Sequence, residues 1–96
     1  MKAIVVITDS DAIPAFERAL LESGDRGFTV VPTVWGRGKT GFKAGDRVHP
    51  GGSSLLFTVV AEEEQKAVLA LVREVRDRAG ARELTKIYVT GVEEAD

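Results

Sequence analysis

The chain has 96 residues, a formal net charge of −2 and no cysteine. Its length predicts one domain over residues 1–96, and its 44% apolar and 29% charged residues are typical of a globular, cytoplasmic protein without a membrane-spanning segment. The lack of cysteine excludes disulfides, thiolate catalysis and Cys-type metal sites, and a charge near zero argues against nucleic acid as a partner.

The first predicted elements are a strand and a helix. Residues 3–8 form a continuous apolar, β-branched run, which is typical of a buried strand. The helix that follows is expected to take Ser10 or Asp11 as its N-cap and to end at Gly24. Its buried face is predicted to hold three large apolar residues at helical spacing: Ile13, Phe16 and Leu20.

A second strand is predicted over residues 27–35. Pro32 within it has no N–H to donate to a strand ladder. We therefore expect this strand at an edge of the sheet, or with a bulge at the proline.

A glycine-rich basic arm, residues 36–52, follows the second strand. It holds six of the ten glycines, four cations against one aspartate, and the only histidine. This gives the arm a charge of +3, so the other 79 residues carry −5. Glycines let a backbone approach a ligand closely, so the arm predicts a site for an anion. The spacing of a Walker phosphate loop is absent, and an ordinary hairpin loop is an equal alternative.

The second half of the chain repeats the strand, helix and strand pattern. Residues 53–61 predict a strand, three glutamates from Glu62 open a helix, Gly80 ends it, and residues 85–90 form the last strand. The buried face of this helix is predicted to contain five residues: Val68, Leu71, Val72, Val75 and Ala79.

The element order βαββαβ predicts an α+β fold of the ferredoxin-like type. In this fold two helices cover one face of a four-stranded antiparallel sheet, here with a long loop between strands 2 and 3. The strands do not alternate apolar with polar residues, because residues 4–7, 55–57 and 87–89 are continuously apolar. We expect other copies of the chain to cover the second face, as a trimer or dimer. The alternative is that these residues are strand formers at a partly wet surface.

Catalysis has little support in the sequence. No serine has an identifiable histidine and carboxylate partner, and His49 has no second metal ligand nearby, so we predict neither an enzyme nor an obligatory cofactor. RNA recognition on the sheet would need exposed aromatic residues. The candidates, Phe57 and Tyr88, are expected to be buried.

Five short motifs occur in order along nearly the whole chain. They are Met1-Lys2-x-Ile4, the strand end at Ile7, Gly24-x-x-Gly27-Phe28-Thr29-Val30, Gly36-Arg37-x-Lys39, and Lys86-Ile87-Tyr88-Val89-x-x-Val92-Glu93-Glu94-Ala95. In this order and spacing they resemble the PII nitrogen-regulatory signal-transduction proteins.

The resemblance implies a homotrimer of ferredoxin-like subunits that binds a small-molecule effector in the clefts between neighbours. The effector would be ATP, ADP, AMP or a small anion such as bicarbonate, and the long T-loop would regulate a membrane transporter or an enzyme. Carried over by position, the implied nucleotide-binding residues are Ile7, Thr29, Gly36, Arg37, Gly38, Lys39 and Lys86. The implied T-loop contacts to the partner are Phe42, Lys43, Arg47 and His49.

The chain departs from the family pattern at several positions, so it resembles a divergent member. The glycine-rich B-loop pattern TGxxGDGK is replaced over residues 79–86, where only Gly80 and Lys86 match. Gly38 stands where the family has a glutamine that helps bind magnesium and 2-oxoglutarate. The T-loop tyrosine and the C-terminal arginines are missing.

Two other families share this fold and stay open as alternatives. CutA-type trimers are metal-linked, and His49 is the only obvious soft ligand here. Effector-binding domains of amino-acid-responsive regulators bind an amino acid between subunits without a phosphate contact.

Overall fold

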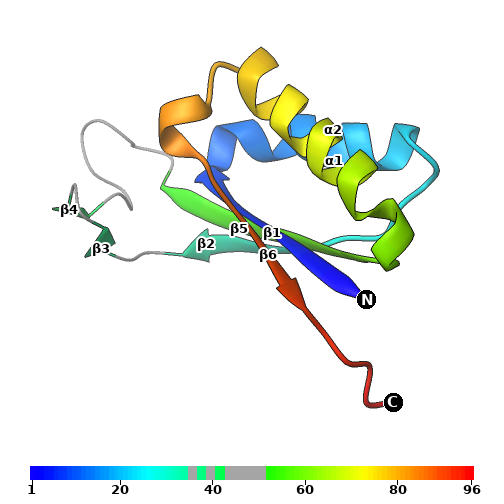
Figure 1. The fold of residues 1–96 in the computed structure, drawn as a ribbon. Helices are drawn as coiled ribbons and strands as arrows, with labels where there is room; N and C mark the ends of the chain where they lie inside the picture. The colour runs from blue at the N-terminus through cyan, green and yellow to red at the C-terminus, as the bar shows by residue number, and fades with distance from the viewer. Residues whose placement is uncertain (35–36, 39–40, 43–51) are drawn as a thin grey trace.

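Two helices lie on one face of a four-stranded antiparallel sheet (Figure 1). In this computed structural model, residues 1–34, 37–38, 41–42 and 52–96 are described. The helices are α1 (Ile13–Glu22) and α2 (Gln65–Arg78). The strands, in their order across the sheet, are β2 (Thr29–Val34), β5 (Ser53–Val60), β1 (Lys2–Asp9) and β6 (Lys86–Gly91). The predicted βαββαβ ferredoxin-like arrangement is confirmed.

Short elements complete the described chain. Three 3-10 helices, η1 (Ser10–Ala12), η2 (Glu62–Glu64) and η3 (Arg82–Leu84), precede α1, α2 and β6 respectively. Within the arm, β3 (Arg37–Gly38) pairs with β4 (Gly41–Phe42) as a small antiparallel ribbon. No strand was predicted within the arm, for which an anion-binding loop and an ordinary hairpin loop were equal alternatives.

The core lies between the helices and the face of the sheet they cover. On the strands, Ile4, Val6 and Leu56 are fully buried, and the predicted face of α1 meets them. The buried residues of α1 are Ile13, Phe16 and Leu20, as expected. On α2 the prediction holds for Val68, Val72 and Val75. It is wrong for Ala79, which is exposed because it follows the last helical turn, and Leu71 is only half-buried.

Both helices end at the predicted glycines. Gly24 has φ +115° and Gly80 has φ +67°, which are backbone conformations that residues with a side chain rarely adopt. After α2, the Gly80 N–H donates to the Asp77 carbonyl at 3.2 Å and the Ala81 N–H donates to the Arg76 carbonyl at 3.0 Å. This pair of bonds is the Schellman motif, which satisfies the last carbonyls of the helix.

The predicted N-cap of α1 is wrong. The chain enters the helix through η1, and no side chain of the described residues caps it. The hydroxyl of Ser10 is instead bonded to Ser54 at 2.7 Å. A tertiary hydrogen bond thus takes the hydroxyl that the local pattern assigned to the helix end.

Strand β2 lies at the edge of the sheet, and its register with β5 shifts between Val31 and Val34. Pro32, which lies inside the shift and cannot donate to the ladder, predicted an edge position or a bulge, and the strand has both an edge position and a register shift. The strand begins at Thr29, two residues later than predicted.

Candidate functional site

The side of the sheet opposite α1 and α2, which we call the helix-free face, has a largely apolar surface. Side chains alternate along a strand, so residues next to the buried Ile4, Val6 and Leu56 point to this face. Strand pairing arranges them in rows. One row is Thr29, Phe57, Val5 and Tyr88; the next is Val31, Leu55, Ile7 and Lys86; a third is Val59, Ala3 and Thr90.

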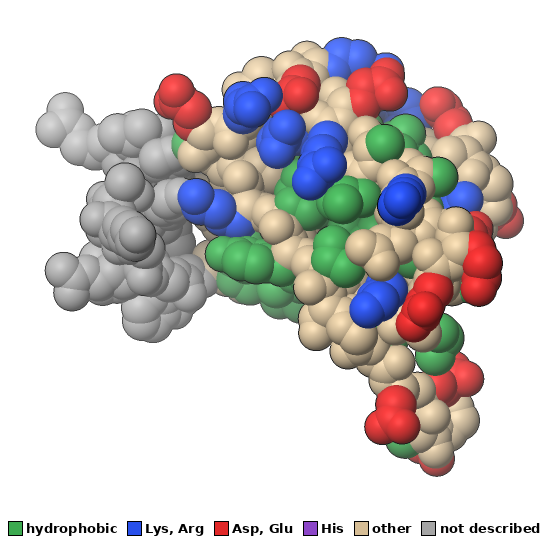
Figure 2. Space-filling model, in the orientation of Figure 1, with side chains coloured by type: hydrophobic (Ala, Val, Ile, Leu, Met, Phe, Trp, Pro, Cys, Tyr) green, Lys and Arg blue, Asp and Glu red, His purple; other side chains and the backbone are tan. Residues whose placement is uncertain are grey.

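Several large apolar side chains on this face are open to solvent. Val31 is 41% exposed, Val59 46% and Tyr88 56%. The expected burial of Tyr88 is therefore not found in the single chain, and Phe57 beside it is half-buried. The expectation that the strands carry large apolar residues on both faces is confirmed. The space-filling view shows hydrophobic side chains at the surface of the sheet below the helices, as well as between the helices (Figure 2).

Three of the predicted nucleotide-binding residues lie on the helix-free face. Ile7 and Lys86 are direct partners in the β1–β6 ladder, and Thr29 lies in the neighbouring row. Lys86 is exposed, whereas Ile7 is half-buried. Together they present an apolar surface beside a cation. An apolar patch beside a positive charge suits a ligand with a flat apolar group and an anionic group.

The other predicted residues belong to the arm. The backbones of Arg37 and Gly38 form β3, and the backbone of Phe42 in β4 pairs with that of Arg37. The remaining predicted residues, Gly36, Lys39, Lys43, Arg47 and His49, lie outside the described residues.

A serine network that no local pattern in the sequence predicted joins the two sides of the arm. The Ser54 hydroxyl donates to the Pro32 carbonyl, so the 2.7 Å bond between Ser10 and Ser54 must have Ser10 as its donor. The Ser10 N–H also donates to the Gly52 carbonyl at 3.1 Å. The end of β2 and the start of β5 are therefore both tied to the turn after β1. In the sequence, the signal for this network was Ser54 at the start of β5.

A second hydroxyl network, which was also not predicted, lies behind Lys86. The Thr85 hydroxyl donates to the Ala81 carbonyl at 2.6 Å and accepts a bond from the Thr8 hydroxyl at 2.7 Å. Thr8 is fully buried and Thr85 is 7% exposed. The first bond connects the start of β6 to the turn after α2, and the second connects it to β1.

The clearest ionic contact on the helix side joins two elements. Arg26 Nη1 donates to Glu64 Oε2, which links the loop before β2 to η2. This hydrogen bond, and secondarily the charge of Arg26, lowers the pKa of the Glu64 carboxyl below its ordinary value. The Arg26 Nε atom is buried and has no hydrogen-bond partner among the described residues. The Arg76 hydrogen bond likewise lowers the pKa of the Asp77 carboxyl.

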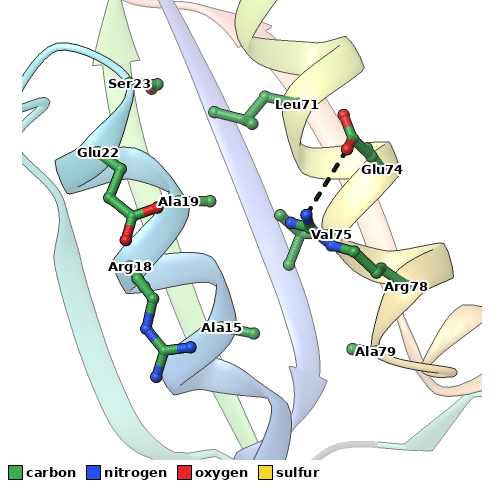
Figure 3. A pocket seen from close by; sticks show the side chains of 10 residues that line it. All are labelled: Ala15, Arg18, Ala19, Glu22, Ser23, Leu71, Glu74, Val75, Arg78 and Ala79. Atoms are coloured by element: carbon green, nitrogen blue, oxygen red, sulfur yellow. Dashed lines mark ion pairs between the residues drawn. The ribbon is translucent and has the colours of Figure 1, made fainter.

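A groove of about 540 Å³ lies between α1 and α2 (Figure 3). Its walls include Ala15 and Ala19 on one helix and Leu71 and Val75 on the other. Its rim carries Arg18, Glu22, Glu74 and Arg78, with Arg78 Nη1 3.7 Å from Glu74 Oε1. Of the predicted site residues that the structure describes, none lines this groove. The helix-free face, which carries Ile7, Thr29 and Lys86, therefore stays the candidate site.

Two further observations concern the described part of the chain. Within it, no helix is long and apolar enough to cross a bilayer. Nor does it contain a group of three or more His, Cys, Asp and Glu side chains placed to hold a metal ion.

Comparisons with known proteins found one matching family model and a similar structure described as PII-like. The family model described as "Nitrogen regulatory protein P-II" matches residues 1–96. The structure of CPII, a nitrogen regulatory PII-like protein from Thiomonas intermedia bound to ADP, AMP and bicarbonate, has a similar fold, with a TM-score of 0.66 and 17% identity. The match covers 97% of this chain and 88% of that one. The search of curated proteins found no match.

Proposed function

The chain belongs to the P-II nitrogen regulatory protein family, and on that premise we propose that it is a homotrimeric regulator that binds an adenine nucleotide between its subunits. It acts by binding and not by catalysis. The ligand-dependent state of its T-loop is read by a membrane transporter or an enzyme.

The apolar helix-free face supports the assembly. Val31, Val59 and Tyr88 are exposed there, and removing a large apolar side chain from water contributes about 1.5 to 3 kcal/mol. Since α1 and α2 already cover the opposite face, a neighbouring copy is the simplest partner for this surface. In the proposed trimer, the three helix-free faces point toward a common axis. The edges of the three sheets then border the three clefts between subunits.

The Ile7 and Lys86 pair is the observation that carries the ligand proposal. It places an apolar side chain and an exposed ammonium group side by side at the end of β1 that leads into Ser10. The adenine ring packs near Ile7 and Thr29, and the phosphates lie near Lys86 and the base of the arm at Arg37. That CPII was solved with ADP, AMP and bicarbonate supports nucleotides, with or without bicarbonate, as the first ligands to examine.

Calorimetric titration with ATP, ADP, AMP and bicarbonate, together with light scattering of the free protein, tests this function. We expect a mass three times that of one chain and a saturable heat with at least one nucleotide. Divalent metals and a panel of amino acids serve as competitors for the CutA-type and amino-acid-binding alternatives. A trimer that binds a metal or an amino acid and ignores every nucleotide would contradict the proposed ligand class.

The regulated partner calls for a separate experiment. Tagged protein is used to capture partners from its own cell extract with and without the nucleotide identified by calorimetry. We expect a membrane transporter or an enzyme whose recovery changes with the nucleotide. A variant lacking residues 39–49 is the control, because it removes most of the arm and should abolish capture.

A further inference from the structure

Thr85 precedes Lys86 directly, and its side chain is fixed inside the protein. Its hydroxyl donates to the Ala81 carbonyl at 2.6 Å and accepts from Thr8 at 2.7 Å. Thr85 is 7% exposed and Ala81 4%. A buried hydroxyl with both a donor and an acceptor partner is held in one rotamer, because any other leaves a polar group unpaired away from water.

We infer that Thr85 is a positioning residue for Lys86, an inference that rests on the proposed nucleotide site. Successive side chains of a strand point to opposite faces. Holding Thr85 on the helix-covered side therefore directs Lys86 to the helix-free face, beside Ile7.

The network also sets the position of Lys86 along β1. Thr8 follows Ile7 in β1, and Thr85 precedes Lys86 in β6. The Thr8–Thr85 hydrogen bond thus continues the ladder by one step beyond the Ile7–Lys86 pair, on the opposite side of the sheet. A slip of one residue in this pairing would place Lys86 on the wrong face.

The turn before Thr85 supplies the carbonyl that accepts the hydrogen bond of its hydroxyl. The left-handed Gly80 ends α2, and the Ala81 carbonyl then accepts two bonds, from the Leu84 N–H at 3.1 Å and from the Thr85 hydroxyl. The first closes η3 and the second connects η3 to the strand. Residues 80–85 therefore form a compact hydrogen-bonded turn between the end of α2 and Lys86, at the start of β6.

The test compares ADP affinity of the full-length protein and its variants by calorimetry. Thr85→Val keeps the shape of the side chain and removes the hydroxyl, and we expect affinity to fall about threefold to fivefold, up to the equivalent of one lost hydrogen bond. Thr85→Ser keeps the hydroxyl and should restore affinity to within about twofold of wild type. In a Lys86→Ala background, Thr85→Val should cause no further loss, because the group it positions is gone.

Thr58→Val is the matched control. Thr58 is 2% exposed and its hydroxyl donates to the Gly27 carbonyl at 2.7 Å; it lies on β5, which β1 separates from β6 in the sheet. Both valine variants should lower the melting temperature, but only Thr85→Val should weaken ADP binding. Equal losses of affinity in the two variants, or an undiminished effect of Thr85→Val in the Lys86→Ala background, would reduce Thr85 to a structural residue and overturn the inference.

A readout without nucleotide separates this inference from the proposed function. The acetylation rate of the Lys86 amine is measured by mass spectrometry, with Lys66 on α2 as the internal reference. Thr85→Val should change the Lys86 rate at least about twofold relative to Lys66, while Thr58→Val leaves the ratio unchanged. If wild type binds no ADP but the ratio changes, the proposed function fails and the positioning role stands. An unchanged ratio overturns the positioning role whatever the ligand.

Discussion

Ile7 of β1 is directly opposite Lys86 of β6, so an apolar side chain and a cationic one share a row on the helix-free face. The pair brings together residues from the two ends of the chain. Together with Thr29 in the neighbouring row, the pair forms the part of the candidate site that the structure describes in full.

The first prediction concerns the cations of this site. Exchanging both Arg37 and Lys86 for alanine should weaken nucleotide binding at least tenfold, about 1.4 kcal/mol, because two phosphate partners are lost. The control exchanges Lys66 and Arg78 on α2, which removes the same charge from the opposite side of the molecule. Calorimetry measures both. If the two double variants bind equally well, Arg37 and Lys86 are not phosphate ligands.

The second prediction concerns self-association. Tyr88→Asp should convert the proposed trimer into single chains at micromolar concentration, since association would bury a charge within the helix-free face. Leu21→Asp is the control, because Leu21 is similarly exposed, 50% against 56% for Tyr88, but lies on α1. Light scattering gives the mass of each variant. A trimer that survives Tyr88→Asp would show that another surface joins the subunits.

The third prediction concerns the core. Phe16 is 1% exposed between α1 and the sheet, so Phe16→Ala should lower the free energy of unfolding by about 3 to 5 kcal/mol. Leu21→Ala, on the solvent side of the same helix, should change it by less than about 0.5 kcal/mol. Urea titrations at one protein concentration measure both, because the stability of an oligomer depends on concentration. A small effect of Phe16→Ala would mean that the helix is not packed as described.

The fourth prediction concerns the end of α2. Gly80 has φ +67° and open space around its Cβ position, so Gly80→Ala should cost about 1 to 2 kcal/mol from backbone strain alone. Gly27 also has open space but does not have a positive φ. Gly27→Ala should therefore be neutral or stabilising by up to about 1 kcal/mol. Thermal unfolding of the two variants distinguishes backbone strain from crowding.

The fifth prediction concerns pH. The Arg26 hydrogen bond lowers the folded-state pKa of Glu64 below its ordinary value of 4.5, so the contact stabilises the protein above that pH and is lost as pH falls through the folded-state pKa. Glu64→Gln should melt at a lower temperature than wild type at pH 7, and the difference should shrink below pH 4.5. Glu63→Gln removes the same charge and keeps the Arg26 contact. A difference that is independent of pH, or equal in both variants, would argue against the contact.

Local patterns in the sequence were sufficient for the architecture. Apolar runs and helical spacing predicted the strands and the buried faces of the helices, and Gly24 and Gly80 marked where both helices end. Pro32 predicted an edge strand or a bulge, and β2 has both an edge position and a register shift. Each of these features depends on a residue and its near neighbours in the chain. They can therefore be recognised in the sequence without knowledge of the fold.

The sequence by itself thus determined the order of elements and the apolar character of both faces of the sheet. Only the tertiary structure decided which polar groups meet. Ser10 was expected at the helix start but bonds to Ser54, and Thr8 bonds to Thr85, 77 residues away along the chain. The Ile7–Lys86 pair likewise depends on the register of β1 with β6. Such contacts follow from how distant strands align, and periodicity within one segment carries no information about that alignment.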